Sequence, residues 1–143
     1  MLRRKIIIIS VNKIFDLLVE NWGESLAKKW LKDNSIQRED YRNGQLNGNA
    51  CKKLLEKLEN LRSQVPRRLG KYIEALSLFN DVRKSCFGQD LLPSFKLDIE
   101  RFKKAYERLG VPFTNKVHVL VEHVPEFCDQ TKRGLGFYSE QAR

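Results

Sequence analysis

Two histidines and a glutamate near the end of the chain are the residues best suited to chemistry. His118 and Glu122 are four residues apart, a spacing that places both side chains on one face of an α-helix. His123 follows His118 by five residues, which predicts that it lies on a different face. A metal site needs at least one more ligand, and the zinc-protease motif has its two histidines four residues apart. We therefore expect ordinary helical pairing of His118 with Glu122, and no metal site.

The other reactive residues form no complete catalytic set. Neither of the two histidines lies beside a recognisable nucleophile, so no Ser–His–Asp or Cys–His–Asn triad can be assembled. Gly134 and Gly136 lack the third glycine and the preceding strand of a phosphate-binding loop. Cys51, Cys86 and Cys128 form no C-x-x-C pair and lie on apolar helical faces, which predicts buried free thiols in a reducing compartment. The residues predict a protein that is not an enzyme and has no cofactor.

The charge of the chain favours a polyanionic partner. Among 143 residues, 27 are Lys or Arg and 18 are Asp or Glu, so the formal net charge is +9. Such an excess attracts nucleic acid through counterion release, although a lysine-rich surface that only keeps the protein in solution is the alternative. The candidate phosphate contacts are basic residues on expected outward faces: Lys52, Lys53, Lys57, Arg67, Arg68, Lys103, Lys104, Lys132 and Arg133.

Apolar residues recur at steps of three and four along most of the chain, which is the period of an amphipathic helix. Ile6–Ile9 are β-branched and fit either a short strand or the start of the first helix. A bend or a break is expected at Asn21–Gly23. The expected fold is all-α, a single domain over residues 1–143 with five to six helices. The expected helices span residues 11–32, 49–63, 66–87, 94–109 and 115–129.

Each expected helix carries one apolar stripe that should contribute to a common core. Trp22 and Trp30 lie on the first stripe and are interpreted as core residues. Asn49 is expected to cap the second helix, after a polar loop over residues 36–48 that contains two Asn-Gly pairs. The core is expected to include Phe15, Leu18, Leu54, Leu58, Ile73, Leu76, Phe102, Tyr106, Leu120 and Val124.

The N-terminus has the basic start and the apolar run of a signal peptide. Ser10 interrupts that run, Asn12-Lys13 ends it, and no small-residue cleavage site follows. No stretch approaches the roughly 18 apolar residues of a membrane span. We expect an intracellular protein, and a nuclear one if its partner is nucleic acid.

Three segments together are similar to a known family. The first joins IQREDY at 36–41 to GQLNGNACKKLL at 44–55, and the second is SCFG at 85–88. The third and most specific is KVHVLVEHVPEFC at 116–128, which leads into GLGFYSEQA at 134–142. Over residues 10–143 the chain thus resembles the C-terminal part of large proteins encoded by DNA transposable elements in invertebrates.

The resemblance implies a helical insertion within an RNase-H-like transposase core. In that family, three acidic residues hold two divalent metal ions for strand cleavage and transfer. Glu140 is the only position that would stand near the last of these carboxylates, and the other two would precede residue 1, with Ile6–Ile9 as a remnant of their sheet. Ser139–Arg143 has the pattern of a first helical turn, so a fragment of a longer protein is expected. One carboxylate cannot build a two-metal site, so the implied fragment is catalytically incomplete.

Two functions from different classes stay open at this point. A nucleic-acid-binding segment would use the basic residues, with Tyr41 or Tyr138 stacking on bases. A protein-interaction bundle, or an inert relic of a transposon, would use its charge only for solubility. Convergence of the basic residues on one face favours binding, and dispersal among acidic partners disfavours it. We expect weak, non-specific duplex binding to which Arg67 and Arg68 contribute, and no Mg²⁺-dependent nuclease or strand-transfer activity.

Overall fold

The computed structural model describes residues 2–37 and 45–135 of the chain. The regular structure of these residues is helical and contains no strand, which confirms the all-α prediction. Glu140, Tyr41, Tyr138 and the helical turn expected over Ser139–Arg143 lie outside the described residues. No helix in the described ranges has both the length and the apolar character needed to cross a membrane.

The first expected helix is divided by a glycine. α1 (Leu2–Trp22) and α2 (Glu24–Asp33) are separated by Gly23, whose φ of 123° is strongly disfavoured for residues with a side chain. The remaining elements are α3 (Gly48–Glu56), α4 (Leu58–Gln64), the 3₁₀ turn η2 (Arg67–Leu69), α5 (Gly70–Cys86), α6 (Phe95–Glu107), α7 (Asn115–His118), the π-helix η3 (Val119–His123) and α8 (Val124–Thr131).

The structure has slightly more helices than the five to six expected. The described residues form seven when the continuous run α7–η3–α8 is counted once. Gly23 divides the first expected helix, and Lys57, with φ −112° and ψ 22°, divides the second. The sequence left a strand or the start of a helix open for Ile6–Ile9. These residues belong to α1 and are therefore helical.

The cap of α3 differs from the prediction. Asn47, not Asn49, is the N-cap residue, and its side chain accepts a hydrogen bond from the Ala50 backbone N–H at 2.9 Å. Asn47 has the extended backbone typical of a cap, whereas Asn49 already lies inside the first turn. Either asparagine suits a cap by type, and the point at which the chain leaves the loop decides between them.

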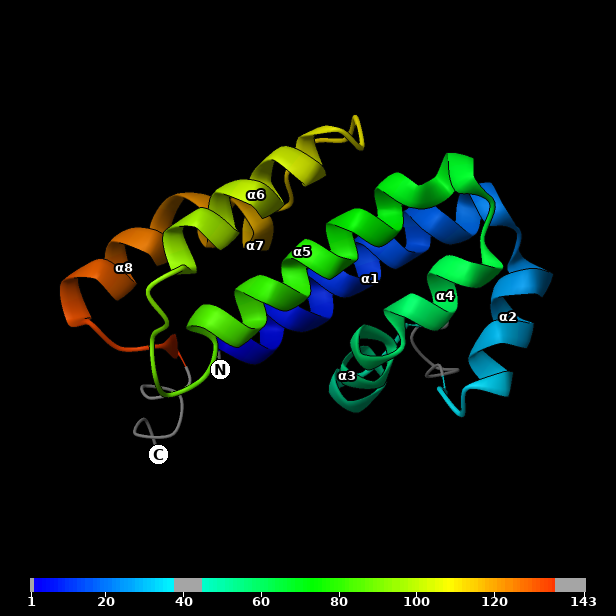
Figure 1. Cartoon of the computed structure of the whole chain (residues 1–143), viewed down its shortest axis with the longest axis horizontal. Helices are drawn as coiled ribbons and strands as arrows, with labels where there is room; N and C mark the ends of the chain where they lie inside the picture. Colours follow the sequence, from blue (N-terminus) through cyan, green and yellow to red (C-terminus); the bar gives the residue numbers. More distant parts are fainter. Residues whose placement is uncertain (1, 38–44, 136–143) are drawn as a thin grey trace.

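α1 and α5 run antiparallel through the middle of the molecule (Figure 1). At one end the Arg3 guanidinium donates to the Phe87 carbonyl at 3.2 Å, and at the other Asn21 Nδ2 donates to the Tyr72 hydroxyl at 3.1 Å. α6, α7 and α8 lie on one side of this pair, toward the left of the view, and α2, α3 and α4 lie on the other side (Figure 1). The N-terminus of α1 therefore meets the C-terminus of α5.

The ten residues predicted for the core are all buried. A contact between aromatic rings joins α5 to α6, with the centroids of Phe79 and Phe102 5.4 Å apart. Within α6, Phe102 also contacts Tyr106 at 5.9 Å between centroids. Trp30 is buried as predicted and donates to the Asn60 side chain at 2.8 Å, whereas Trp22 is half-buried. The three cysteines are buried free thiols, as predicted.

Candidate functional site

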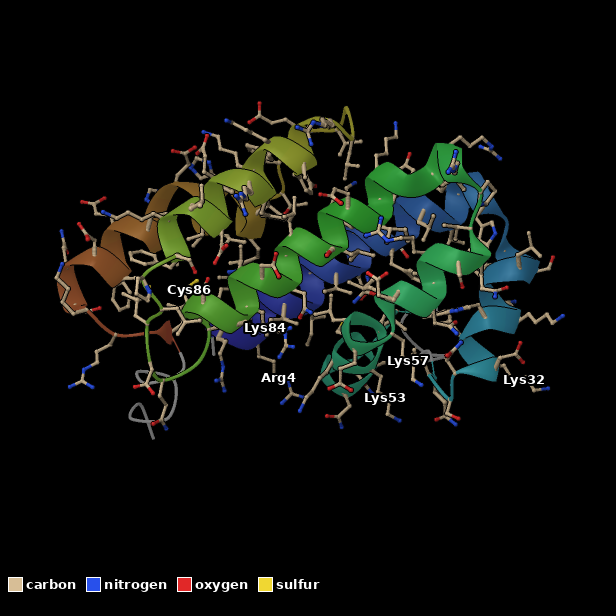
Figure 2. The ribbon with its side chains drawn as sticks, in the orientation of Figure 1. Arg4, Lys32, Lys53, Lys57, Lys84 and Cys86 are labelled. Atoms are coloured by element: carbon tan, nitrogen blue, oxygen red, sulfur yellow. The ribbon has the colours of Figure 1, made fainter. Side chains whose placement is uncertain are left out.

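A cavity rich in Lys and Arg lies where the start of α1, the start of α3 and the end of α5 meet. It has a volume of about 710 Å³, and among the described residues that line it five are basic and none is acidic. We call this cavity the basic groove. Figure 2 shows Arg4 and Lys84 near each other on this side of the molecule. The basic residues are Arg3 and Arg4 from α1, Lys52 from α3, and Arg83 and Lys84 from α5.

The antiparallel packing of α1 against α5 brings together residues that are far apart in the sequence. Arg3 and Arg4 follow the start of α1, and Arg83 and Lys84 precede the end of α5. The Arg3 guanidinium is held by the Phe87 carbonyl at 3.2 Å, and Arg83 Nε donates to Asn80 Oδ1 at 3.0 Å. Hydrogen bonds to a backbone carbonyl and to a side-chain amide thus help to orient two guanidinium groups of the groove.

Asn12, a buried residue of α1, positions α3 beside the groove. Its Nδ2 donates to the carbonyls of Ile8 (2.8 Å) and Leu46 (2.9 Å), and its Oδ1 accepts from the Leu46 N–H at 2.8 Å. The side chain thereby fixes the residue that precedes the cap of α3. Cys51 lies in the same contact, and burial raises the pKa of its thiol to about 12, so the thiol stays neutral at ordinary pH.

Gly48, the first residue of α3, allows Arg4 to approach closely. A Cβ atom at this position would lie 3.3 Å from Arg4 Nε. Arg4, Lys52 and Lys84 are exposed, and no carboxylate in the described part of the chain forms an ion pair with any of them. Partial burial raises the pKa of Asp81, and the charges of Lys84 and Arg101 lower it, so this carboxyl outside the groove lining interacts with Lys84. Within the described part of the chain, the exposed cations of the groove thus have no ion-pairing carboxylate.

The nine basic residues predicted from the sequence lie in several separate places. Lys52, Lys53 and Lys57 are on or beside α3, Lys103 and Lys104 are on α6, Arg67 and Arg68 form η2, and Lys132 and Arg133 follow α8. α3, α6 and α8 occupy different parts of the molecule (Figure 1). Of the nine, Lys52 lines the basic groove. Figure 2 shows Lys53, Lys57 and Lys32 along the same side of the molecule as Arg4 and Lys84.

Three lysines of the region formed by α6, α7 and α8, which we call the α6–α8 end, are paired with carboxylates: Lys96, Lys103 and Lys132. Lys103 Nζ lies 3.4 Å from Glu122, and Asp129 accepts from both Lys96 (3.1 Å) and Lys132 (3.5 Å). The hydrogen bond from Lys96, together with the charge of Lys132, lowers the pKa of Asp129. These pairs reduce the positive potential that this end presents to a polyanion.

Four of the five basic residues of the groove were not predicted as site residues. Arg3-Arg4 and Arg83-Lys84 are adjacent basic pairs, the same signal that drew attention to Lys52-Lys53. Their position at the start of one long helix and the end of another was available from the sequence. That the two ends meet follows only from the packing of α1 on α5.

The prediction that His118 and His123 lie on different faces of a helix is wrong. Their rings are in contact, with centroids 5.2 Å apart and an interplanar angle of 77°. Val119–His123 forms a π-helical turn, in which residues five apart come into register. Pro125 has no N–H to donate to the carbonyl of Val121, which removes one α-helical hydrogen bond at this point.

Glu122 does not form the pairing with His118 that the spacing predicts. Its carboxylate pairs with Lys103 of α6, and no hydrogen bond or ion pair in the described part of the chain joins it to His118. Within the same ranges, no group of three His, Cys, Asp or Glu side chains is placed to hold a metal ion.

The chain matches no protein-family model, no curated protein and no solved structure. The basic groove and the charges around it are the features that bear on its function.

Proposed function

We propose that the protein binds nucleic acid without sequence preference, through the basic groove and the lysines that lie along the same side. The observation that carries the proposal is the convergence of five Lys and Arg side chains from three helices on one cavity, whose lining among the described residues includes no acidic side chain. Gathering like charges costs free energy, and a phosphate backbone offsets this cost while releasing its counterions.

The chemistry of the groove suits phosphate better than bases. Arginine presents a planar fork that binds two phosphate oxygens, and lysine adds a mobile point charge. Phe87 is the aromatic residue of the lining, but it is 2% exposed and its face is not available for stacking on a base. Contacts with phosphate position a nucleic acid without reading its sequence.

The resemblance to transposon-encoded proteins agrees with this proposal. A helical insertion that holds DNA would assist catalytic carboxylates located elsewhere in a longer protein. As part of the same proposal, this chain is a nucleic-acid-holding segment that is not itself an enzyme. An intracellular and nuclear location would follow from such a role.

Fluorescence anisotropy with a short labelled duplex, measured over a range of salt concentrations, tests the proposal. We expect a dissociation constant in the micromolar range or weaker at physiological salt. The logarithm of the affinity should fall with the logarithm of the salt concentration, with a slope of about −0.9 per phosphate contact. Replacing both Arg4 and Lys84 by Ala should reduce the magnitude of this slope by about 1.8.

The variant with Arg67→Ala and Arg68→Ala is the matched control, because it removes the same charge from η2. Its effect on the slope should be the smaller of the two. Absence of binding at low salt, or equal effects of the two double substitutions, would contradict the proposal and favour the interaction-bundle or relic alternative.

A further inference from the structure

We infer that the basic groove binds the phosphorylated end of a nucleic-acid strand, in preference to a phosphate in the interior of a strand. The inference rests on the proposed function and names the part of a nucleic acid that the groove fits best. It comes from the shape of the groove, from the number of its charges and from the way its arginines are held.

The shape of the groove favours a strand end. A cavity of about 710 Å³ falls within the range of pockets that enclose a small ligand. It can take a terminal phosphate together with its nucleoside, but a double helix is far too large to enter it. Interior phosphates of a duplex would contact only its rim, where Arg4, Lys52 and Lys84 are exposed.

The charge of the groove also favours a terminal phosphate. An interior phosphodiester carries one negative charge and two free oxygens, whereas a terminal monoester carries about −1.5 to −2 near pH 7 and three acceptor oxygens. The cations approach from three sides, because Arg3 and Arg4 come from α1, Lys52 from α3, and Arg83 and Lys84 from α5. A group with three free oxygens can be contacted from all three helices at once.

The arginines of the groove are partly ordered before any ligand binds. Arg3 is held by the Phe87 carbonyl and Arg83 by Asn80, and the Arg4 side chain packs on Gly48. Side chains that are already ordered lose less conformational entropy on binding, so their contacts contribute more to affinity. The half-buried Ile7 offers apolar surface to a sugar or a base but no group that distinguishes one base from another.

Single-stranded oligonucleotides of one sequence, with a 5′-phosphate, a 3′-phosphate or hydroxyl groups at both ends, test the inference by anisotropy with an internal label. We expect at least one phosphorylated form to bind roughly tenfold more tightly than the hydroxyl form, the increment of a few charge-assisted hydrogen bonds. The two phosphorylated forms distinguish which end the groove accepts. Equal affinity for all three oligonucleotides would overturn the inference.

Variants separate end recognition from general attraction. Arg4→Ala and Lys84→Ala, each at an exposed position, should remove most of the preference for the phosphorylated form. Lys53→Ala removes one charge outside the groove lining and should lower the affinity for all three oligonucleotides by the same factor. Persistence of the preference in the Arg4 and Lys84 variants would overturn the inference.

The failure of this inference can be told apart from failure of the proposed function. Salt-dependent duplex binding without a preference for phosphorylated ends would reject end recognition alone. Loss of binding to every nucleic acid at low salt would reject both.

Discussion

The basic groove and the α6–α8 end carry basic residues of the same kind in opposite electrostatic settings. At the α6–α8 end, Lys103 faces Glu122, and Asp129 is shared between Lys96 and Lys132. In the groove, five Lys and Arg side chains share a cavity that is lined by no carboxylate from residues 2–37 or 45–135. Lys103-Lys104 and Arg83-Lys84 look alike in the sequence, but they differ in the charges that other helices bring to them.

This difference separates charge that maintains solubility from charge that is available to a ligand. Exposed ion pairs contribute little to stability, but they cancel the local potential that a polyanion would meet. The net charge of +9 is therefore unevenly available over the surface, and five of the basic side chains gather in the groove. Four substitutions, in order of decreasing expected effect, test this comparison.

Asn12→Ala should remove the support of the groove and leave the α6–α8 end unchanged. Removing the Asn12 amide exposes no new surface to water, but it leaves the buried N–H and C=O of Leu46 without their hydrogen-bond partner. The free energy of unfolding should therefore fall by about 2 kcal/mol, which urea denaturation measures. Asn21→Ala, on the exposed side of the same helix, is the control and should cost less than about 1 kcal/mol. Equal losses in both variants would show that Asn12 has no special role in holding α3.

Gly134→Ala should disturb the contact that joins the two regions. A Cβ atom at this position would overlap the carbonyl oxygen of Gly88, a residue of the groove lining. We expect a loss of about 1–2 kcal/mol in thermal or chemical denaturation, since the backbone must shift to relieve the overlap. Gly70→Ala, where a Cβ meets nothing within 4 Å, should be neutral or slightly stabilising. A neutral Gly134→Ala variant would mean that the segment after α8 does not rest on Gly88.

Asp129→Asn should make the α6–α8 end more like the groove. The substitution releases Lys96 and Lys132 from their shared carboxylate, so duplex affinity at low salt should rise by roughly twofold and fall more steeply with salt. Glu59→Gln, which removes the exposed partner of Arg62, is a control of equal charge change. If this rise in duplex affinity is as large as the fall in affinity caused by Arg4→Ala together with Lys84→Ala, the groove has no advantage over any other basic surface.

Gly48→Ala should have the smallest effect. The new methyl group would displace the Arg4 guanidinium by a few tenths of an ångström, so the preference for a phosphorylated strand end should fall by less than about twofold while stability is unchanged. Gly88→Ala, in the same groove but with open space around its Cβ, should leave the preference intact. If both variants behave alike, the position of Arg4 over Gly48 is not important for binding.

The features that depend on local periodicity were predictable from the sequence. The apolar repeat placed Phe15, Ile73 and Phe102 in the core, and each is fully buried. Gly23 was expected to bend or break the first helix, and it separates α1 from α2. The three thiols were expected to be buried and free, as they are. Each of these features depends on neighbours within about a turn of helix, which a single sequence contains.

Features that depend on the meeting of distant segments were not predictable in this way. Asn12 looked like a polar residue that ends an apolar run, yet it is 4% exposed because its amide joins α1 to Leu46. His118 and His123 were assigned to different faces because an α-helix was assumed, and the π-helical turn before Pro125 changes the register. For Asn12 a hydrogen bond to a distant segment overrides the local pattern, and for the histidines a backbone irregularity does so.

The sequence by itself determined that this chain is helical, which residues form its core and that it carries an excess of positive charge. Only the tertiary structure decided where that charge is available. Arg4 and Lys84 meet because α1 and α5 pack antiparallel, and Lys103 is neutralised because η3 brings Glu122 beside α6. Electrostatic interaction depends on distance in space, and composition contains no information about which helix ends will be neighbours.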